Sequence, residues 1–388
     1  MATLSYDVVI LGAGIAGAGL AAALADSGLE VALVEPRVTQ APGDAWDSRI
    51  YAVSPGAVAF LAASGAWERM DALRIAHIET MRVYGDHASA SLEFNAYDAG
   101  LGELAHIAES GRMQYALWQR IAELPNVTVH HASCVGFNAE SSHVALSLSS
   151  GPTLTTRLAV GADGARSWLR EAAGIAVRVH DYEAHGVVAN FAVEKPHHST
   201  AWQWFRADGV LALLPLPGQR VSMVWSTPHT HAQELLSLDA STLAQRVAAA
   251  SLNVVGALKI ITPATAFALA RQRVDCLVKP RIALVGDAAH NVHPLAGQGV
   301  NLGLRDAREL ASVLKNRGAQ YDCGDYALLR RYERARKEDV LSMSLATDGL
   351  QKLFASKTVW ASTVRNLGMR MTDQQRWLKT LLTQHAAA

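Results

Sequence analysis

The sequence predicts a mixed α/β (α+β) fold, in which a parallel-sheet domain carries an inserted, mostly antiparallel β-sheet domain and is followed by C-terminal helices. A strand, a glycine turn, a helix and a second strand follow one another within residues 6–35. Apolar and polar residues alternate over 78–94, as in a hairpin, and β-rich stretches separated by turn residues occupy most of 182–263, before a buried-strand pattern returns at 282–285. Because the two patterns interleave, we expect the parallel-sheet domain to be discontinuous.

The first unit has the form of a dinucleotide-binding βαβ motif. The apolar run 6–11 leads into the turn Gly12-Ala13-Gly14-Ile15-Ala16-Gly17, an alanine-rich helix and a strand that ends at Glu35. Gly12 allows the tight turn, Gly14 leaves room for a pyrophosphate, and Gly17 allows close packing of helix on strand. The free N–H groups of the helix attract phosphate, and Glu35 is placed to accept hydrogen bonds from a ribose. The motif predicts a Rossmann-like domain.

A membrane span is the alternative for this stretch, because residues 8–25 carry no charge and approach the length of a span. Four glycines within it, Asp7 in front of it and the absence of a basic leader argue against both a span and a signal peptide.

Composition excludes several classes of protein. Lys+Arg and Asp+Glu both number 35 in 388 residues, so there is no basic surplus of the kind that marks a nucleic-acid binder. Charged residues are only 18% and hydrophobic residues 50%, which favours an apolar ligand or contact with a membrane. Cys134, Cys276 and Cys323 lie far apart, which fits a reducing compartment and predicts neither disulfides nor a zinc site. We expect a cytoplasmic protein.

The domain boundaries follow from where the patterns change. We expect the nucleotide-binding domain at 1–75, 105–178 and 272–330, the β-sheet substrate domain at 76–104 and 179–271, and a C-terminal helical region at 331–388. In chain order the expected elements include helices over 54–70, 113–124 and 238–250, a hairpin over 78–94, and strands over 127–131, 144–148, 154–159, 186–193, 201–205, 210–214, 221–226 and 282–285.

Two further glycine stretches follow the ends of expected strands. In the first, Asp163 lies in a Gly-Ala-Asp-Gly turn, where a phosphate-bound cofactor would reach it. In the second, Asp287 follows Gly286, and the loop 294–299 leads into a helix that begins near Val300 and Asn301. A carboxylate there can hold a ribitol or ribose hydroxyl, and the N-terminus of that helix would stabilise negative charge on a reduced flavin ring. Arg49 can meet a phosphate or form a surface salt bridge, and the residues alone leave both open.

These three stretches together resemble the three fingerprints of the aromatic-ring (class A) FAD-dependent monooxygenases, which have the para-hydroxybenzoate hydroxylase fold. Within that group the chain resembles the ubiquinone-biosynthesis hydroxylases over essentially its whole length. The motifs that carry this resemblance are Asp47-Ser48-Arg49, Ala52-Val53-Ser54, Leu213-Leu214-Pro215-Leu216, Val224-Trp225-Ser226, His293-Pro294-Leu295-Ala296-Gly297-Gln298-Gly299, Asn301-Leu302-Gly303 and Arg305-Asp306. Two places depart from the family pattern, at 112–115, where an acid followed by Asn is commoner, and at Val210, where Pro is commoner. These departures bear on substrate selectivity and not on the cofactor.

The resemblance implies FAD as cofactor and NAD(P)H as a transient co-substrate, since no second glycine fingerprint is present. It implies FAD contacts from Gly12, Ala13, Gly14, Ile15, Ala16, Gly17, Glu35, Pro36, Arg37, Arg49, Gln114, Val135, Asp163, Gly286, Asp287, Pro294, Gly297, Gln298, Gly299, Val300 and Asn301. The flavin would face the loop that holds His293, Pro294, Gly297 and Gln298, and no side chain is assigned as acid, base or nucleophile.

The activity that the resemblance implies is hydroxylation of the aromatic ring of a polyprenyl phenol in ubiquinone biosynthesis, with O2 captured as a flavin C4a-hydroperoxide. The substrate would lie between the inserted sheet and the Pro294 loop, against Trp202, Trp204, Phe205, Leu211 and Leu213, although each of these is individually more typical of a core residue. A flavin-dependent reductase or halogenase on the same fold, and an inactive flavin-binding accessory subunit, remain alternatives. The triplet 202–204 resembles halogenase sequences, but Phe205-Arg206 follows it instead of Ile-Pro.

Other features concern partners. No metal is expected, because the close histidine pairs 290/293 and 229/231 have no third ligand nearby in the sequence. From residue 346 onward an amphipathic pattern carries a surplus of basic residues, which fits packing on the catalytic domain or peripheral binding to the inner face of the membrane. A ubiquinone-biosynthesis complex and a homo-oligomer are the other partners considered.

Overall fold

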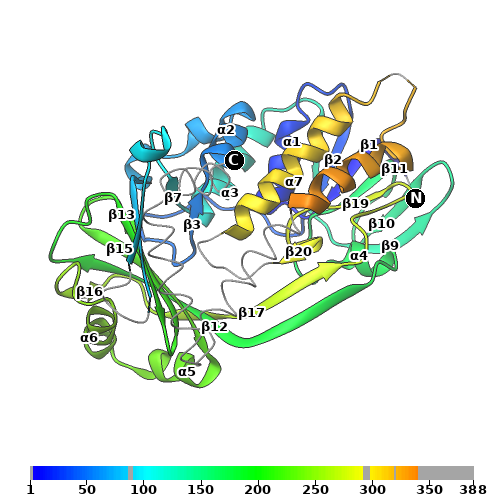
Figure 1. Ribbon diagram of the computed structural model, residues 1–388. Helices are drawn as coiled ribbons and strands as arrows, with labels where there is room; N and C mark the ends of the chain where they lie inside the picture. The colour runs from blue at the N-terminus through cyan, green and yellow to red at the C-terminus, as the bar shows by residue number, and fades with distance from the viewer. Residues whose placement is uncertain (1–2, 86–90, 292–297, 319, 340–388) are drawn as a thin grey trace.

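The computed structural model describes residues 3–85, 91–291, 298–318 and 320–339, and it contains three β-sheets with helices packed on and between them (Figure 1). The expected C-terminal amphipathic helices, from residue 346 onward, lie outside the described residues, as does the loop 292–297. No helix of the described part of the chain is long and apolar enough to cross a membrane.

The first sheet has eight strands in the order β18-β19-β11-β1-β2-β8, with β10 added to β11 and β9 to β10. Strands β19, β11, β1, β2 and β8 run parallel to their neighbours in this order, which confirms the parallel-sheet prediction. Its strands are β1 (Thr3–Leu11), β2 (Val31–Val34), β8 (Val127–His130), β9 (Cys134–Ala139), β10 (Val144–Leu148), β11 (Thr153–Gly161), β18 (Val278–Lys279) and β19 (Ile282–Leu284).

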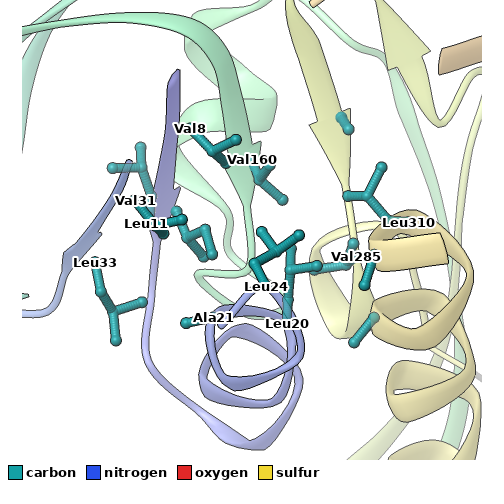
Figure 2. Close-up of a cluster of buried hydrophobic side chains, with 14 of the residues drawn as sticks. Val8, Leu11, Leu20, Ala21, Leu24, Val31, Leu33, Val160, Val285 and Leu310 are labelled. Carbon is teal, nitrogen blue, oxygen red and sulfur yellow. The ribbon is translucent and has the colours of Figure 1, made fainter. Parts of the chain in front are cut away.

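Helices α1 (Ile15–Ala23) and α7 (Gln298–Lys315) pack against this sheet and against each other. Leu20 of α1 and the adjoining Leu24 are fully buried, and they point towards Val160 of β11 and Leu310 of α7 (Figure 2). Each fully buried side chain of this kind stabilises the fold by about 1.5–3 kcal/mol. This core fixes the position of the N-terminus of α1, where the glycine turn lies.

The second sheet has nine strands in the order β20-β17-β12-β15-β14-β13-β5-β6, with β16 paired to β12. All of its pairings are antiparallel except β13 with β5, which confirms a mostly antiparallel sheet. Strands β12 and β17 form a long ribbon that reaches from this sheet towards the first (Figure 1). The strands are β5 (Thr80–Tyr84), β6 (Ser91–Asn95), β12 (Val177–Val193), β13 (Thr200–Arg206), β14 (Gly209–Leu216), β15 (Arg220–Pro228), β16 (Leu258–Ile260), β17 (Thr265–Val274) and β20 (His290–Asn291).

One face of the second sheet is covered by two helices, α5 (His229–Ser237) and α6 (Ala240–Ala250), where the sequence predicted one. The Asp239 side chain caps α6 by accepting hydrogen bonds from the N–H groups of Ser241 and Thr242, so α6 has a start signal in the sequence. Helix α5 follows Pro228 without a side-chain cap, and it was therefore missed.

The third sheet is small and antiparallel, in the order β3 (Ile50–Val53), β7 (Ala105–Glu109), β4 (Ala76–Ile78). The helix expected over 54–70 is interrupted: α2 (Pro55–Ala63) ends before Gly65, whose φ of +76° is left-handed, and the short helix η1 (Trp67–Arg69) follows. The other described helices are η2 (Ala72–Arg74), η3 (Tyr97–Ala99), α3 (Ser110–Ile121), α4 (Trp168–Ala172), η4 (Gly286–Ala288) and residues 326–339.

Candidate functional site

A cavity of about 1380 Å³ is lined by residues of all three sheets. One end is lined by the glycine turn after β1, the end of β2 and the Gly286-Asp287 turn, and the other by the inner face of the nine-stranded sheet. Residues that lie far apart in the sequence therefore meet around a single space.

The glycine turn forms a cradle for phosphate. Gly12 has φ +97°, and a Cβ there would lie 2.4 Å from the carbonyl oxygen of Ala162; a Cβ on Gly17 would lie 2.0 Å from the oxygen of Gly12. A Cβ on Gly14 would meet nothing within 4 Å, although Gly14 lines the cavity. Gly12 and Gly17 are thus required by the fold. Gly14 instead leaves open space at the N-terminus of α1, which has no side-chain cap.

Three side chains hold the peptide groups of Ala13. Its N–H donates to Oε2 of Glu35 (3.1 Å), and its carbonyl accepts from Nε2 of Gln114 (3.1 Å) and Nε1 of Trp118 (3.2 Å). Gln114 and Trp118 are one turn apart on α3 and share a face, which is the signal that could have identified Trp118 from the sequence. Glu35 lines the cavity, and its two oxygens retain acceptor capacity for a ribose hydroxyl beyond the bonds from Ala13 and Arg37.

Asp163 has one oxygen engaged and one free. Its Oδ2 accepts from the N–H groups of Trp168 (2.7 Å) and Leu169 (3.1 Å) at the start of α4, whereas Oδ1 is buried and has no hydrogen-bond partner among the described residues. An unsatisfied buried carboxylate oxygen beside the cavity calls for a donor from a ligand. Nearby, burial raises the pKa of Cys134 to about 12, so this cavity-lining thiol is not a nucleophile at neutral pH.

Asp287, in η4, and Arg49, just before β3, both line the cavity. Burial within the surrounding protein raises the pKa of Asp287, and the positive charges of His290 and Arg49 act against that rise. The Arg49 guanidinium has no hydrogen bond or ion pair within the described residues, which leaves its donors available to an anionic ligand. This geometry favours the ligand role over a surface salt bridge.

Behind Asp287 a fully buried ion network fixes the turn. Asp306 of α7 accepts from the N–H of Gly286 (2.8 Å) and contacts Nε2 of His290 (2.7 Å) and Nε of Arg336 (2.6 Å). Burial raises the pKa of Asp306, but His290 and Arg336 outweigh this and hold the pKa below its usual range. The network locks η4, β20, α7 and the helix 326–339 together.

The remaining sequence-predicted cofactor residues are placed as follows. Ile15, Ala16, Pro36, Arg37, Gly286, Gly299 and Val300 line the cavity, as do Gly12, Gly14, Glu35, Arg49, Gln114, Asp163, Asp287 and Asn301. Ala13 and Gly17 shape the turn behind it, and Val135 is 62% exposed and not among the lining residues. His293, Pro294 and Gly297 lie outside the described residues, and Gln298 is described only as the first residue of α7.

The Asn301 side chain has a supporting role. It accepts from the N–H of Ser54 (2.9 Å) and donates to the carbonyl of Ala52 (2.9 Å), so its amide joins α7 to β3 and to the N-cap residue of α2. These two bonds fix the orientation of the amide, while Gly299 and Val300 of the first turn of α7 line the cavity beside it.

The sheet end of the cavity is mainly apolar. The lining residues there include Met81, Phe94, Ala201, Val210, Ala212, Leu214, Val224 and Phe267. Gln203 of β13 lies beside Ala212 of β14, and Ser226 of β15 lies beside Val210 of β14, so both belong to the cavity-lining face of the sheet. They are only 6% and 8% exposed, and their side chains make no hydrogen bond with the described residues. Both were missed from the sequence.

For three members of the predicted substrate wall the structure confirms the alternative, a place in the core, and the face of β14 that lines the cavity is the other one. Leu211 and Leu213 point away from the cavity and pack with Trp204 into the core under α5 and α6. Since side chains alternate along a strand, the cavity receives Val210, Ala212 and Leu214 instead. Of the five residues proposed, Trp202 lines the cavity, and Phe205 packs against Val83.

Taken together, the open phosphate cradle at Gly14, the unpaired Asp163 oxygen and the free Arg49 fit the pyrophosphate and hydroxyl groups of a dinucleotide. The FAD binding domain family model matches residues 5–343. The structure is similar to p-nitrophenol 4-monooxygenase PnpA from Pseudomonas putida DLL-E4, with a TM-score of 0.79 over 100% of this chain and 99% of that chain, at 16% identity. The site and the family match thus define an FAD-binding protein, whose fold is that of a solved monooxygenase.

Two curated relatives narrow the class. The chain is 33% identical to ubiquinone hydroxylase UbiL from Rhodospirillum rubrum, over 98% of this chain and 89% of that protein. It is 32% identical to 3-demethoxyubiquinol 3-hydroxylase from Escherichia coli (strain K12), over 98% of both chains. The chain belongs to the ubiquinone-biosynthesis hydroxylase family of FAD-dependent aromatic-ring monooxygenases.

Proposed function

We propose that this protein uses FAD, NAD(P)H and O2 to hydroxylate the aromatic ring of a polyprenyl phenol in ubiquinone biosynthesis. The observation that carries the proposal is the continuity of the cavity, which joins a polar dinucleotide cradle to an apolar chamber. The relatives named above are ubiquinone-pathway hydroxylases by name, which supports the same class of substrate.

The residues of the cradle would hold the cofactor in an extended position. The N-terminus of α1 and Gly14 would face the pyrophosphate, Glu35 the adenosine ribose, and Asp287 a ribitol hydroxyl, with Arg49 neutralising negative charge. Bound FAD would supply the electron transfer and oxygen activation. The protein itself holds the substrate ring in place and excludes water.

The apolar chamber suits a prenylated ring. Ile78, Met81, Phe94, Leu104, Val210 and Leu214 offer a surface for an isoprenoid tail. Gln203 and Ser226 offer unpaired hydrogen-bonding groups for oxygen substituents on the ring, since buried polar groups that lack partners favour a ligand that supplies them.

The insolubility of a polyprenyl tail also motivates the proposal that the protein works at a membrane surface or in a complex. Co-sedimentation of the full chain with anionic vesicles would test binding to a membrane surface.

The activity is tested with purified FAD-loaded protein, NADH or NADPH, labelled ¹⁸O2 and a phenol with a short prenyl chain. The proposal predicts one labelled oxygen on the ring. Stoichiometric hydrogen peroxide with every phenol offered would contradict hydroxylation and favour an oxidase-like reductase. Halide-dependent ring halogenation would favour a halogenase, and a flavin that NAD(P)H never reduces would favour an accessory subunit.

The cofactor site is tested separately with Asp287→Asn. Loss of a charged hydrogen bond typically costs about 1.5–3 kcal/mol, so FAD affinity should fall about 10- to 100-fold in a flavin titration of the apoprotein. The raised pKa of Asp287 means that its ionised form opposes folding of the apoprotein as pH rises. The Asn variant should therefore be at least as stable as wild type without FAD, which separates lost binding from lost folding. Full FAD affinity would contradict the assigned contact.

A further inference from the structure

A second cluster of polar side chains lies outside the cavity, on the small three-stranded sheet. His77 of β4 and His106 of β7 are directly opposite each other in the antiparallel register, and Glu103 comes just before β7. Nδ1 of His77 is 2.8 Å from Oε2 of Glu103, and Nε2 of His106 is 3.3 Å from Oε1 of the same carboxylate. One ligand atom from each of the three side chains lies within 4.8 Å of the others.

We propose that His77, Glu103 and His106 form a binding site for a divalent transition metal ion such as Zn²⁺. Two imidazoles and one carboxylate are a ligand set that zinc uses with a fourth, open position. The ligand atoms of a tetrahedral zinc site lie about 3.3 Å apart for metal–nitrogen bonds of about 2.0–2.1 Å. The observed nitrogen–oxygen separations of 2.8 and 3.3 Å are close to that spacing, and all three ligand atoms lie within 4.8 Å of one another.

The surroundings combine rigidity with access. The His106 side chain is 8% exposed and packs edge-on against Trp67, at 5.2 Å between ring centroids, whereas the His77 side chain is 55% exposed. A buried ligand on one strand and an exposed ligand on the next give an ion an entry path from solvent and a fixed base. The mixed nitrogen and oxygen donors favour zinc, cobalt, nickel or copper over Mg²⁺ and Ca²⁺, which prefer oxygen donors.

The three residues lie at the two ends of the segment 78–102, which contains β5 and β6 of the second sheet. His77 lies before β5, and Glu103 and His106 lie after β6, so an ion would join the two crossings of the chain. The neighbours Ile78 and Leu104 line the cavity while His77, between buried Ala76 and Ile78, points to the other face of β4. A bound ion would therefore stiffen one wall of the apolar chamber from its outer side.

Titration calorimetry of untagged, chelator-treated, FAD-loaded full-length protein with Zn²⁺ tests the proposal, together with metal analysis after dialysis. We expect one zinc per chain at this site and unchanged binding in a large excess of Mg²⁺. His77→Ala and Glu103→Gln should each lower the affinity by about tenfold or more, because even residues that only support a ligand often cost that much. Because the His77 side chain is exposed, His77→Ala should leave the protein folded, and a lower zinc affinity in this variant would reflect the loss of a ligand.

The matched control is His185→Ala. His185 and His229 form another close histidine pair, with their Nδ1 atoms 3.4 Å apart, but no carboxylate completes a three-ligand group there among the described residues. This variant should keep the wild-type zinc affinity. Equal affinity in wild type, His77→Ala and Glu103→Gln, or no saturable binding in wild type, would overturn the proposal.

Discussion

At the dinucleotide end of the cavity, side chains of the protein hold the backbone of the glycine turn and of the Gly286-Asp287 turn, whereas at the sheet end Gln203 and Ser226 have no protein partner among the described residues. Around Ala13 and Asp306, hydrogen bonds and ion pairs run from the site into the core. The sheet end is a surface of alternating side chains whose backbone is satisfied by neighbouring strands. Substitutions of the side chains that hold these turns at the dinucleotide end should therefore lower the stability of the protein as well as ligand binding. Substitutions of cavity-facing side chains at the sheet end should affect ligand binding with little effect on stability.

The largest effect should follow Asp306→Asn. The change leaves His290 and Arg336 buried beside a neutral amide, and breaking a buried ion pair from one side costs about 3–5 kcal/mol. Urea unfolding of the apoprotein measures the loss. The control is Glu234→Gln, which removes an exposed pair with Arg246 (2.8 Å) and should cost less than about 1 kcal/mol. Equal losses in the two variants would show that the network does not support the site.

The same network predicts a dependence on pH. Because the pKa of Asp306 is lowered in the folded protein, its stabilisation is present above the ordinary carboxyl pKa, near pH 4, and is lost as the pH falls through the lowered value. Burial lowers the pKa of His290, but Asp306 outweighs this and raises it, so that contribution is lost as the pH rises through the raised value. Asp306→Asn should remove both dependences, and an unchanged profile would contradict this assignment.

An effect of intermediate size on stability is expected for Gly12→Ala but not for Gly14→Ala, although both glycines belong to the same turn. Gly12→Ala meets the carbonyl of Ala162 at a left-handed φ and should destabilise the protein by about 2–4 kcal/mol. Gly14→Ala places its methyl group in open space, so the apoprotein should unfold like wild type while FAD affinity falls. Unfolding curves and flavin titrations of both variants check this. Equal destabilisation by the two changes would show that Gly14 serves the fold and not the ligand.

The smallest effect should come from Gln203→Leu at the sheet end. Loss of one neutral hydrogen bond costs about 0.5–1.5 kcal/mol, so the KM for the phenol should rise about 3- to 10-fold, with unfolding and FAD affinity unchanged. Gln219→Leu, at an exposed position between β14 and β15 of the same sheet, is the matched control and should leave KM unaltered. A stability loss as large as that of Gly12→Ala would contradict the contrast between the two ends.

Local patterns identified the parts whose signals are short-range. The turn at Gly12–Gly17, the parallel strands around it and the hairpin of β5 with β6 all follow from spacing within a few residues. Helix α5 has no cap signal. The strand β17 was not distinguished, because its apolar first half, which lines the cavity, is followed by the polar run Arg271-Gln272-Arg273 and the two halves share no single alternation. Which face of β14 lines the cavity was left open by the sequence, since alternation alone does not say which of two apolar faces meets α5 and α6.

Glycine spacing and strand-end carboxylates are local requirements of dinucleotide binding, so the sequence was enough to predict the family, the cofactor and most of the residues that line the polar end of the cavity. The partners that hold these residues depend on how distant parts of the chain fold together. Folding brings Gln114 and Trp118 to the carbonyl of Ala13, turns the amide of Asn301 towards β3, and places His77 opposite His106 on neighbouring strands. These contacts join residues up to 249 positions apart, and no local spacing encodes a distance of that kind.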